Sequence, residues 1–417
     1  MIDEGLKTKL LKYNQNYILA SLERMTGEDK EKLINQLLNI DFEEMENLYS
    51  LTKGVTVEKD EIIEPMKHED ITKLDIDTKQ KYVKIGEEII KSNKFAVVTM
   101  AGGQGTRLGH NGPKGTFDMG LDSHKSLFEI FSDKLNCASK KYDAKINWYI
   151  MTSKENNGET IRFFEDKNYF GYGKELVTKF FEQRQLPMLD ENGKILINEN
   201  GFVKEAANGH GGVFEAMFIN GVLDDMKKKG VEWIFICGVD NPLVNMVDPL
   251  FIGFSAANKY IASSKTLEKA YPKEKVGAFC KKNGSPYVME YTEISDELAN
   301  LRNNDGELVY GESHVLLNLY NIVALEKIKE AKLPYHVAHK KSNYMDVDGR
   351  IVIAEKPNAY KFETFLFDGF SLLPDVGLLR GIRENDFAPI KNATGDDSPE
   401  TARKLYLDYE KRLKEGE

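Results

Sequence analysis

The sequence predicts an α/β fold built on a mixed, mostly parallel sheet. Short, continuous apolar runs occur at residues 95–100, 146–151 and 233–237. Runs of this kind are typical of strands that are buried on both faces of a parallel sheet. Helix-like stretches such as residues 213–229 separate them. The alternation of strands with helices therefore indicates a doubly wound sheet.

The chain has 417 residues, 41% of them hydrophobic and 30% charged. This length is about two to three times that of a usual single domain, so we expect one large domain with smaller additions. The net charge of −10 argues against binding to a nucleic-acid backbone, which requires a basic face. An anionic substrate would need a local basic pocket.

The apolar runs are far shorter than the roughly 20 residues that cross a bilayer. The first residues, MIDEGLKTKLLKYNQNY, contain acidic side chains and no apolar core of a secretory signal. We therefore expect no membrane partner and a cytoplasmic protein. The three cysteines, Cys137, Cys237 and Cys280, fit no metal or disulfide spacing, so we expect buried free thiols.

The elements follow in order along the chain. Apolar residues at helical spacing predict helices in residues 1–60, and a further helical stretch ends near Lys91. After the buried strands, segments 276–280 and 287–291 flank Asn283-Gly284 and predict an antiparallel hairpin inserted on the main sheet. A last helix over 399–414 is predicted to begin after Ser398. We expect three parts: a helical region (1–88), a central domain (89–370) and a small C-terminal domain (371–417).

A glycine-rich loop, AGGQGTRLGHNGPKG, follows the first buried strand directly. Glycines let backbone N–H groups approach phosphate oxygens, and Arg107 and Lys114 add positive charge. A dinucleotide fingerprint fails because Leu108 occupies the third glycine position, and no Walker P-loop string occurs. A purely structural turn is disfavoured by two cations and six glycines in one loop.

This loop belongs to a series of motifs that resembles the sugar-nucleotide pyrophosphorylases. The resemblance is greatest to the UDP-sugar branch that includes eukaryotic-type UDP-N-acetylglucosamine pyrophosphorylase. The motifs occur in the family's order over nearly the whole chain: AGGQGTRLG with PKG, FFEQRQLP (180–187), CGVDNPLVNMVDPLFIGF (237–254), MEYTEIS (289–295), LPYHVAHKK (333–341), KPNAYKFETFLFDGF (356–370) and DSPETAR (397–403). The resemblance implies a Rossmann-like nucleotidyltransferase core with smaller N- and C-terminal domains.

The resemblance implies an enzyme, a UTP-dependent sugar-1-phosphate nucleotidyltransferase that acts on UTP and a hexose 1-phosphate. Its products are a UDP-sugar and pyrophosphate. Both substrates are polyanions, so catalysis requires positive charge rather than a general base. Arg107 and Lys114 match family positions that contact the phosphates, and Lys361 matches a lysine that reaches them from the far side of the cleft. Asp240 matches a carboxylate that holds Mg²⁺, the one expected cofactor.

The nucleotide-binding positions are also implied by the resemblance. The family reads uracil through backbone and amide groups that correspond here to Ala101, Gly102, Gln183 and Gly209, and Gly103 is a further nucleotide-binding position. An amide side chain such as that of Gln183 can pair with both a donor and an acceptor on the uracil edge.

The sugar positions depart from the family pattern. The matching residues are His210, Gly211, Glu290 and His314. Where the N-acetylglucosamine branch has asparagine, this chain has His210 and His314, and histidine presents a different size and set of donors. The main interpretation is therefore an enzyme of the N-acetylglucosamine 1-phosphate branch, with glucose 1-phosphate or galactose 1-phosphate as alternative substrates.

Two alternatives from other classes remain to be separated by experiment. A non-catalytic nucleotide-sugar sensor could share this fold, but it would be expected to lack the charged set, which is complete here. A nicotinamide-dependent oxidoreductase is disfavoured by Leu108. The sequence leaves the oligomeric state open, with a monomer as one state that fits.

Overall fold

The computed structural model describes residues 3–54 and 61–415. The chain forms two compact units, each drawn from separate stretches of sequence. The larger unit contains residues 60–183, 213–332 and 366–417, and the smaller unit contains residues 1–59, 184–212 and 333–365. The boundaries of these units differ from those of the predicted parts 1–88, 89–370 and 371–417. The division of the chain into those three domains stays a prediction.

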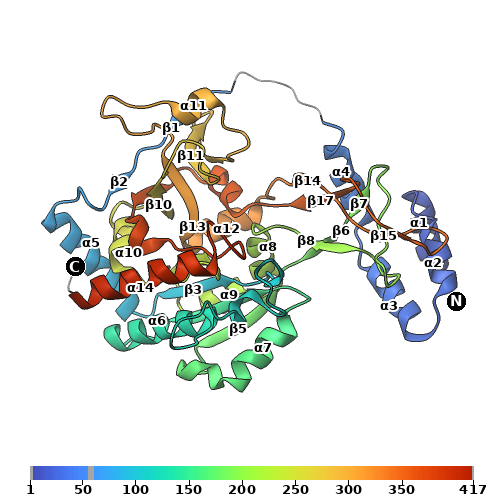
Figure 1. The fold of residues 1–417 in the computed structure, drawn as a ribbon, viewed down its shortest axis with the longest axis horizontal. Helices are drawn as coiled ribbons and strands as arrows, with labels where there is room; N and C mark the ends of the chain where they lie inside the picture. The colour runs from blue at the N-terminus through green and yellow to red at the C-terminus, as the bar shows by residue number, and fades with distance from the viewer. Residues whose placement is uncertain (1–2, 55–60, 416–417) are drawn as a thin grey trace. The chain divides into compact units, whose positions relative to one another are not determined.

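The larger unit is built on one mixed sheet, which confirms the predicted fold class (Figure 1). Its main path runs β2-β18-β10-β13-β9-β3-β4-β5. Neighbouring strands are parallel along this path except where β13 pairs with β9 and β10. The strands are β2 (Glu69–Asp70), β3 (Phe95–Met100), β4 (Asn147–Thr152), β5 (Val177–Glu182), β9 (Trp233–Gly238), β10 (Ala262–Glu268), β13 (Glu312–Asn321) and β18 (Gly377–Arg380).

Helices cover both faces of this sheet. Alternate strand residues such as Val97, Trp148 and Phe235 share a buried cluster with one set of helices, α5 (Ile76–Lys91), α6 (Leu127–Tyr142), α7 (Asn157–Asp166) and α10 (Pro249–Ala257). On the opposite face Tyr149 donates to Asp225 of α9 at 2.7 Å, and Tyr320 contacts Phe214 of α8. The second set is α8 (Gly212–Ile219), α9 (Val222–Lys228) and α12 (Ile322–Glu330).

The predicted hairpin is confirmed as β11 (Gly277–Lys282) and β12 (Ser285–Met289), which pair antiparallel. Asn283 and Gly284 both have positive φ, 52° and 83°, as a two-residue hairpin turn of this type requires. β11 also pairs with β13 and with β1 (Ile63–Pro65), so the hairpin extends the main sheet.

Shorter elements complete the larger unit: η1 (Thr106–Leu108), η2 (Lys114–Thr116), η3 (Asn168–Gly171), α11 (Asp296–Asn300), η4 (Leu366–Leu372), α13 (Arg383–Asp386) and α14 (Pro399–Glu415). The last of these confirms the predicted C-terminal helix. Ser398 precedes it, and its hydroxyl accepts from the backbone N–H of Thr401 at 3.4 Å.

In the smaller unit, four helices and short strands share a buried cluster that includes Leu33, Phe42, Leu189 and Phe362. The helices confirm the helical prediction for the described part of residues 1–60. They are α1 (Glu4–Lys12), α2 (Ile18–Arg24), α3 (Gly27–Leu38) and α4 (Phe42–Leu51). The strands are β6 (Gln185–Pro187), β7 (Leu189–Asp190), β8 (Glu205–Ala207), β14 (His336–Lys340), β15 (Tyr344–Met345), β16 (Ile351–Val352) and β17 (Ala359–Glu363).

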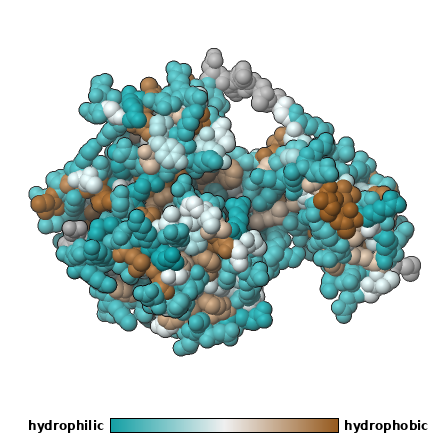
Figure 2. Space-filling model, viewed as in Figure 1, coloured by the Kyte–Doolittle hydropathy of each residue, from teal (hydrophilic) through white to brown (hydrophobic). Residues whose placement is uncertain are grey.

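The three cysteines are free, but only two fit the prediction. Cys237 and Cys280 are buried, whereas Cys137 is exposed on α6, so the expectation of a buried thiol was wrong there. None of the helices in residues 3–54 and 61–415 combines the length and apolar character that crossing a membrane requires. The face in Figure 2 is predominantly hydrophilic, with separate apolar patches.

Candidate active site

The predicted nucleotide and metal residues of the larger unit lie at one edge of its sheet. β9, β3, β4 and β5 are adjacent and parallel, so their carboxyl ends meet at this edge. Ala101 follows β3, Gln183 follows β5, and Asp240 lies two residues after the end of β9. The carboxyl edge of an open α/β sheet is where such folds bind ligands.

The glycine-rich loop closes on itself through its backbone. The Gly105 N–H donates to Gly112 O at 2.9 Å, and the Lys114 N–H donates to Gly103 O at 3.0 Å. Arg107 lies on η1 with an exposed side chain, whereas Lys114 begins η2 with a side chain that is only 17% exposed. The loop therefore holds one exposed cation and one largely buried cation beside its backbone N–H groups.

Lys114 and Asp240 are brought together at this edge. The Lys114 ammonium lies 3.8 Å from Asp240 Oδ2, and the Asp240 side chain is 25% exposed. A carboxylate and an ammonium this close to each other can act on the same bound phosphate. The carboxylate would do so through a metal ion, and the ammonium would contact a phosphate oxygen as a fixed positive charge. In residues 3–54 and 61–415 no cluster of three His, Cys, Asp or Glu side chains is arranged to hold a metal ion.

Gln183 and Gly102 are also adjacent. A Cβ atom added at Gly102 would lie 3.2 Å from Gln183 Oε1, and the Gln183 N–H donates to Thr152 O at 2.9 Å. Gln183 is 8% exposed. This packing brings together two of the residues that the resemblance implies for uracil.

Sequence reasoning missed Asn156, which holds the start of the glycine loop. It is buried, and its Nδ2 donates to Ala101 O at 2.9 Å and to Gly103 O at 3.3 Å. These bonds fix the backbone whose N–H groups would face the nucleotide. The only sequence signal was an asparagine placed shortly after a buried strand, and that position is equally typical of an ordinary turn.

A pocket of about 80 Å³ in the larger unit is lined both by the residue predicted to bind the metal ion and by one predicted to bind the sugar. It is lined by Asp240 and by His314, which lies near the start of β13. Asn241 and Lys391, which sequence reasoning did not single out, also line it. The Lys391 ammonium lies 3.5 Å from Asp397 and its side chain is 44% exposed. The pocket thus contains both signs of charge next to an imidazole.

His314 sits among aromatic rings. It makes edge contacts with Phe279, Phe367 and Phe370, and its Nε2 lies 3.2 Å from Asn318 Oδ1. Glu290 lies just after β12, where its backbone N–H donates to the Glu293 carboxylate at 3.0 Å.

The remaining predicted residues belong to the smaller unit. Gly209 has a φ of +84°, and a Cβ atom there would lie 2.3 Å from Thr364 O, so only glycine fits. The Gly211 N–H donates to Thr364 O at 2.9 Å. His210 stacks on Phe365 with ring centroids 5.3 Å apart. The segment that carries the two glycines and His210 is therefore fixed against the chain that follows β17.

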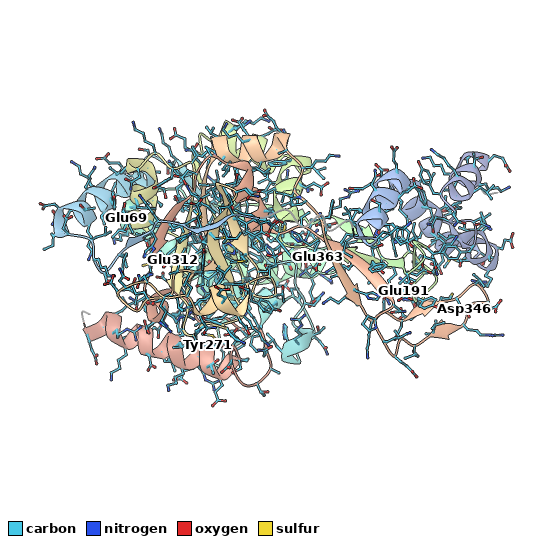
Figure 3. The ribbon with its side chains drawn as sticks, turned by 90° about the horizontal axis from the view of Figure 1, so that it is seen from above. Glu69, Glu191, Tyr271, Glu312, Asp346 and Glu363 are labelled. Carbon is cyan, nitrogen blue, oxygen red and sulfur yellow. The ribbon has the colours of Figure 1, made fainter. Side chains whose placement is uncertain are left out.

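Lys361 lies on β17 of the smaller unit. Its ammonium is 2.8 Å from Glu363 Oε1, and both side chains are 25% exposed. Glu363 is labelled at the end of this strand in Figure 3. The ion pair leaves Lys361 partly accessible to solvent.

Comparison with known proteins gives one consistent result. The family model described as UTP–glucose-1-phosphate uridylyltransferase matches residues 40–396. The chain is 34% identical to UDP-N-acetylglucosamine pyrophosphorylase of Saccharomyces cerevisiae, over 96% of this chain and 89% of the relative. It is also 34% identical to UDP-N-acetylglucosamine diphosphorylase 2 of Arabidopsis thaliana, over 97% of this chain and 83% of the relative.

Solved structures agree with the sequence comparisons. The uridine diphosphate N-acetylglucosamine pyrophosphorylase of Trypanosoma brucei, crystallised with an inhibitor, matches with a TM-score of 0.81 and 29% identity, covering 96% of this chain and 83% of that one. UDP-glucose phosphorylase of Trypanosoma brucei matches with a TM-score of 0.65 at 17% identity, covering 90% and 76%. The second likeness supports the fold alone.

Proposed function

The chain belongs to the family of UTP–glucose-1-phosphate uridylyltransferases, and on this premise we propose that it joins UTP to N-acetylglucosamine 1-phosphate. The products are UDP-N-acetylglucosamine and pyrophosphate. The observation that carries this proposal is the approach of Lys114 to Asp240 at the carboxyl edge of the sheet, beside the glycine-rich loop. This arrangement gathers the two groups that a transfer between phosphates requires, a cation and a metal-binding carboxylate.

In this proposal the cations bind the phosphates of UTP, and an amide and backbone groups bind its uracil. Lys114 and Arg107 neutralise the triphosphate, and the loop's backbone N–H groups add donors to its oxygens. Lys361 is a third cation in this proposal. Gln183 pairs with the uracil edge beside Ala101 and Gly102, and Gly209 belongs to the same nucleotide set.

Magnesium is part of the proposal. Asp240 is the residue that would hold it, and its donor chemistry fits a Mg²⁺ ion that takes most of its oxygen ligands from substrate phosphates and water. The bound ion would supply positive charge at the reacting phosphate. The Lys114 ammonium lies next to this position.

The sugar is the part of the proposal most open to test. Relatives named for N-acetylglucosamine match at 34% identity over nearly the whole chain, and this favours N-acetylglucosamine 1-phosphate over glucose or galactose 1-phosphate. If the chain prefers another sugar 1-phosphate, His210 and His314 are the residues that we expect to determine that preference. Gly211 and Glu290 complete the proposed sugar set. A cytoplasmic location stays a prediction from the sequence, and the oligomeric state stays open.

The test is pyrophosphate release from UTP and Mg²⁺ with the 1-phosphates of N-acetylglucosamine, N-acetylgalactosamine, glucose and galactose. We expect the highest kcat/KM with N-acetylglucosamine 1-phosphate. A preference for glucose 1-phosphate or galactose 1-phosphate would overturn the proposed sugar but keep the reaction. Binding of UTP in calorimetry without turnover of any sugar phosphate would instead support a nucleotide-sugar sensor.

A further inference from the structure

The loop that follows Asp240 is held by Lys134, a half-buried lysine of α6. The Lys134 ammonium donates to Pro242 O at 2.5 Å and to Val244 O at 3.0 Å. Both carbonyls belong to the turn that leads away from β9, within four residues of the predicted metal carboxylate. One side chain therefore bonds two backbone carbonyls of this loop.

A second set of bonds holds the same loop from the segment after β18. Asn241 Nδ2 donates to Asp386 O at 2.7 Å, and its Oδ1 accepts from the Ala388 N–H at 2.9 Å. The Ile390 N–H donates to Asp240 O at 2.8 Å. The backbone of Asp240 is thus placed between two fixed elements, while its carboxylate projects toward Lys114.

Lys134 is itself well fixed. α6 begins with a capping box between Ser126 and Glu129 and packs in the core through Phe128 and Phe131, so its register on the sheet is set. The Lys134 ammonium also lies 5.9 Å from the ring of Tyr406. Burial lowers the pKa of Lys134 to about 7, so an amine at this place has an energetic cost that an apolar side chain would not have. The two hydrogen bonds that the amine donates offset this cost, because the two carbonyls would otherwise be buried without a donor.

We propose that Lys134 is a positioning residue for the uridylyl transfer: by bonding Pro242 O and Val244 O, it fixes the loop that keeps the Asp240 carboxylate beside Lys114. This inference rests on the proposed function. It assigns Lys134 no contact with substrate. Side chains that orient a metal ligand from behind typically account for about 10-fold to 100-fold in metal affinity or activity.

The test compares Lys134→Met, Lys134→Arg and Lys179→Met with the wild-type chain. Methionine keeps the length but removes both donors, whereas the arginine fork can still reach two carbonyls. Lys179 is a matched control because it also donates to a loop carbonyl of the larger unit, Asn220 O, away from the Asp240 loop. Two readouts are measured: amide hydrogen exchange of residues 240–248 in the substrate-free protein, and the Mg²⁺ concentration that gives half-maximal turnover.

We expect Lys134→Met to speed exchange in residues 240–248 and to raise the half-maximal Mg²⁺ concentration by about 10-fold or more. Lys134→Arg should show wild-type exchange and a wild-type half-maximal Mg²⁺ concentration. Lys179→Met should change neither quantity. Normal exchange and normal Mg²⁺ dependence in Lys134→Met would overturn the inference, even if its melting temperature falls. Should that variant not fold, Lys134→Gln, which keeps an amide donor, is judged by the same two readouts. Absence of turnover in the wild-type chain would overturn the proposed function, whereas the exchange comparison needs no substrate and still decides the positioning role.

Discussion

The Lys114 ammonium lies 3.8 Å from the Asp240 carboxylate, although one residue belongs to the glycine-rich loop and the other follows β9. The two strands before them, β3 and β9, pair in parallel with Met100 opposite Gly238. This register brings the loop and the carboxylate to the same edge. The pair is the core of the proposed phosphate site.

Removing the Lys114 charge should lower activity far more than stability. Lys114→Met is expected to reduce kcat/KM by about 100-fold to 1,000-fold, as loss of a group that stabilises transition-state charge typically does. Steady-state assays of pyrophosphate release measure this. Lys140→Met removes an exposed lysine of α6 and should behave as wild type. Equal activity in the two variants would contradict the phosphate role of Lys114.

A methyl group at Gly102 should weaken nucleotide binding. The added Cβ would lie 3.2 Å from Gln183 Oε1, so the amide must shift from its place at the uracil position. We expect Gly102→Ala to raise the KM for UTP by about 10-fold, which corresponds to about 1.4 kcal/mol. Gly158→Ala adds a methyl group to α7 where no atom beyond its chain neighbours and the helix's own backbone lies within 4 Å, and it should leave this KM unchanged.

Substitution of Gly209 should destabilise the smaller unit. Gly209→Ala combines a positive φ of 84° with a Cβ only 2.3 Å from Thr364 O. We expect a loss of about 1–3 kcal/mol or more in the free energy of unfolding. Gly27→Ala has a similar φ of 59° with open space around the Cβ, so it should cost less. Chemical unfolding curves test the order, and a larger loss for Gly27→Ala would refute the steric argument.

Lys134 should make stability depend on pH in a defined direction. Its pKa is lowered from 10.5 to about 7, so between these values the unfolded chain holds a proton that the folded chain has lost. Wild-type stability should therefore rise with pH in this window relative to Lys134→Met, by at most about 1.4 kcal/mol per pH unit. Urea unfolding of both proteins at pH 7, 8 and 9 measures the gap. A difference in unfolding free energy, taken as wild type minus Lys134→Met, that stays constant or falls as the pH rises would contradict the lowered pKa of Lys134.

The strands that position the site could be predicted because burial on both faces leaves a continuous apolar run. Phe95–Met100 and Trp233–Gly238 are such runs, and the glycine loop after the first could be located by composition alone. The hairpin was predictable because Asn283-Gly284 requires one turn type. The exposed Cys137 was missed because residue type was used instead of its position on the helix surface.

The residues that hold the loops in place could not be predicted. Asn156 and Lys134 act through backbone carbonyls that are close only after the chain has folded, and neither belongs to a motif with fixed spacing. Lys391 lines the same pocket as Asp240 from the other end of the sequence. The smaller unit could not be predicted either, because it joins segments 184–212 and 333–365 to the first helices. This joining depends on long-range contacts that leave no local pattern in the sequence.

The most direct test of the account is pyrophosphate release from UTP, Mg²⁺ and N-acetylglucosamine 1-phosphate by the wild-type chain and by Asp240→Asn. Asparagine keeps the size of the side chain and removes the charge that would hold the metal ion. The account predicts release by the wild-type chain that requires both substrates, and a loss of about 100-fold to 1,000-fold in a folded Asp240→Asn variant, because the charge that the metal ion would place at the transition state is lost. Undiminished release by Asp240→Asn, or release by the wild-type chain without a sugar phosphate, would contradict it.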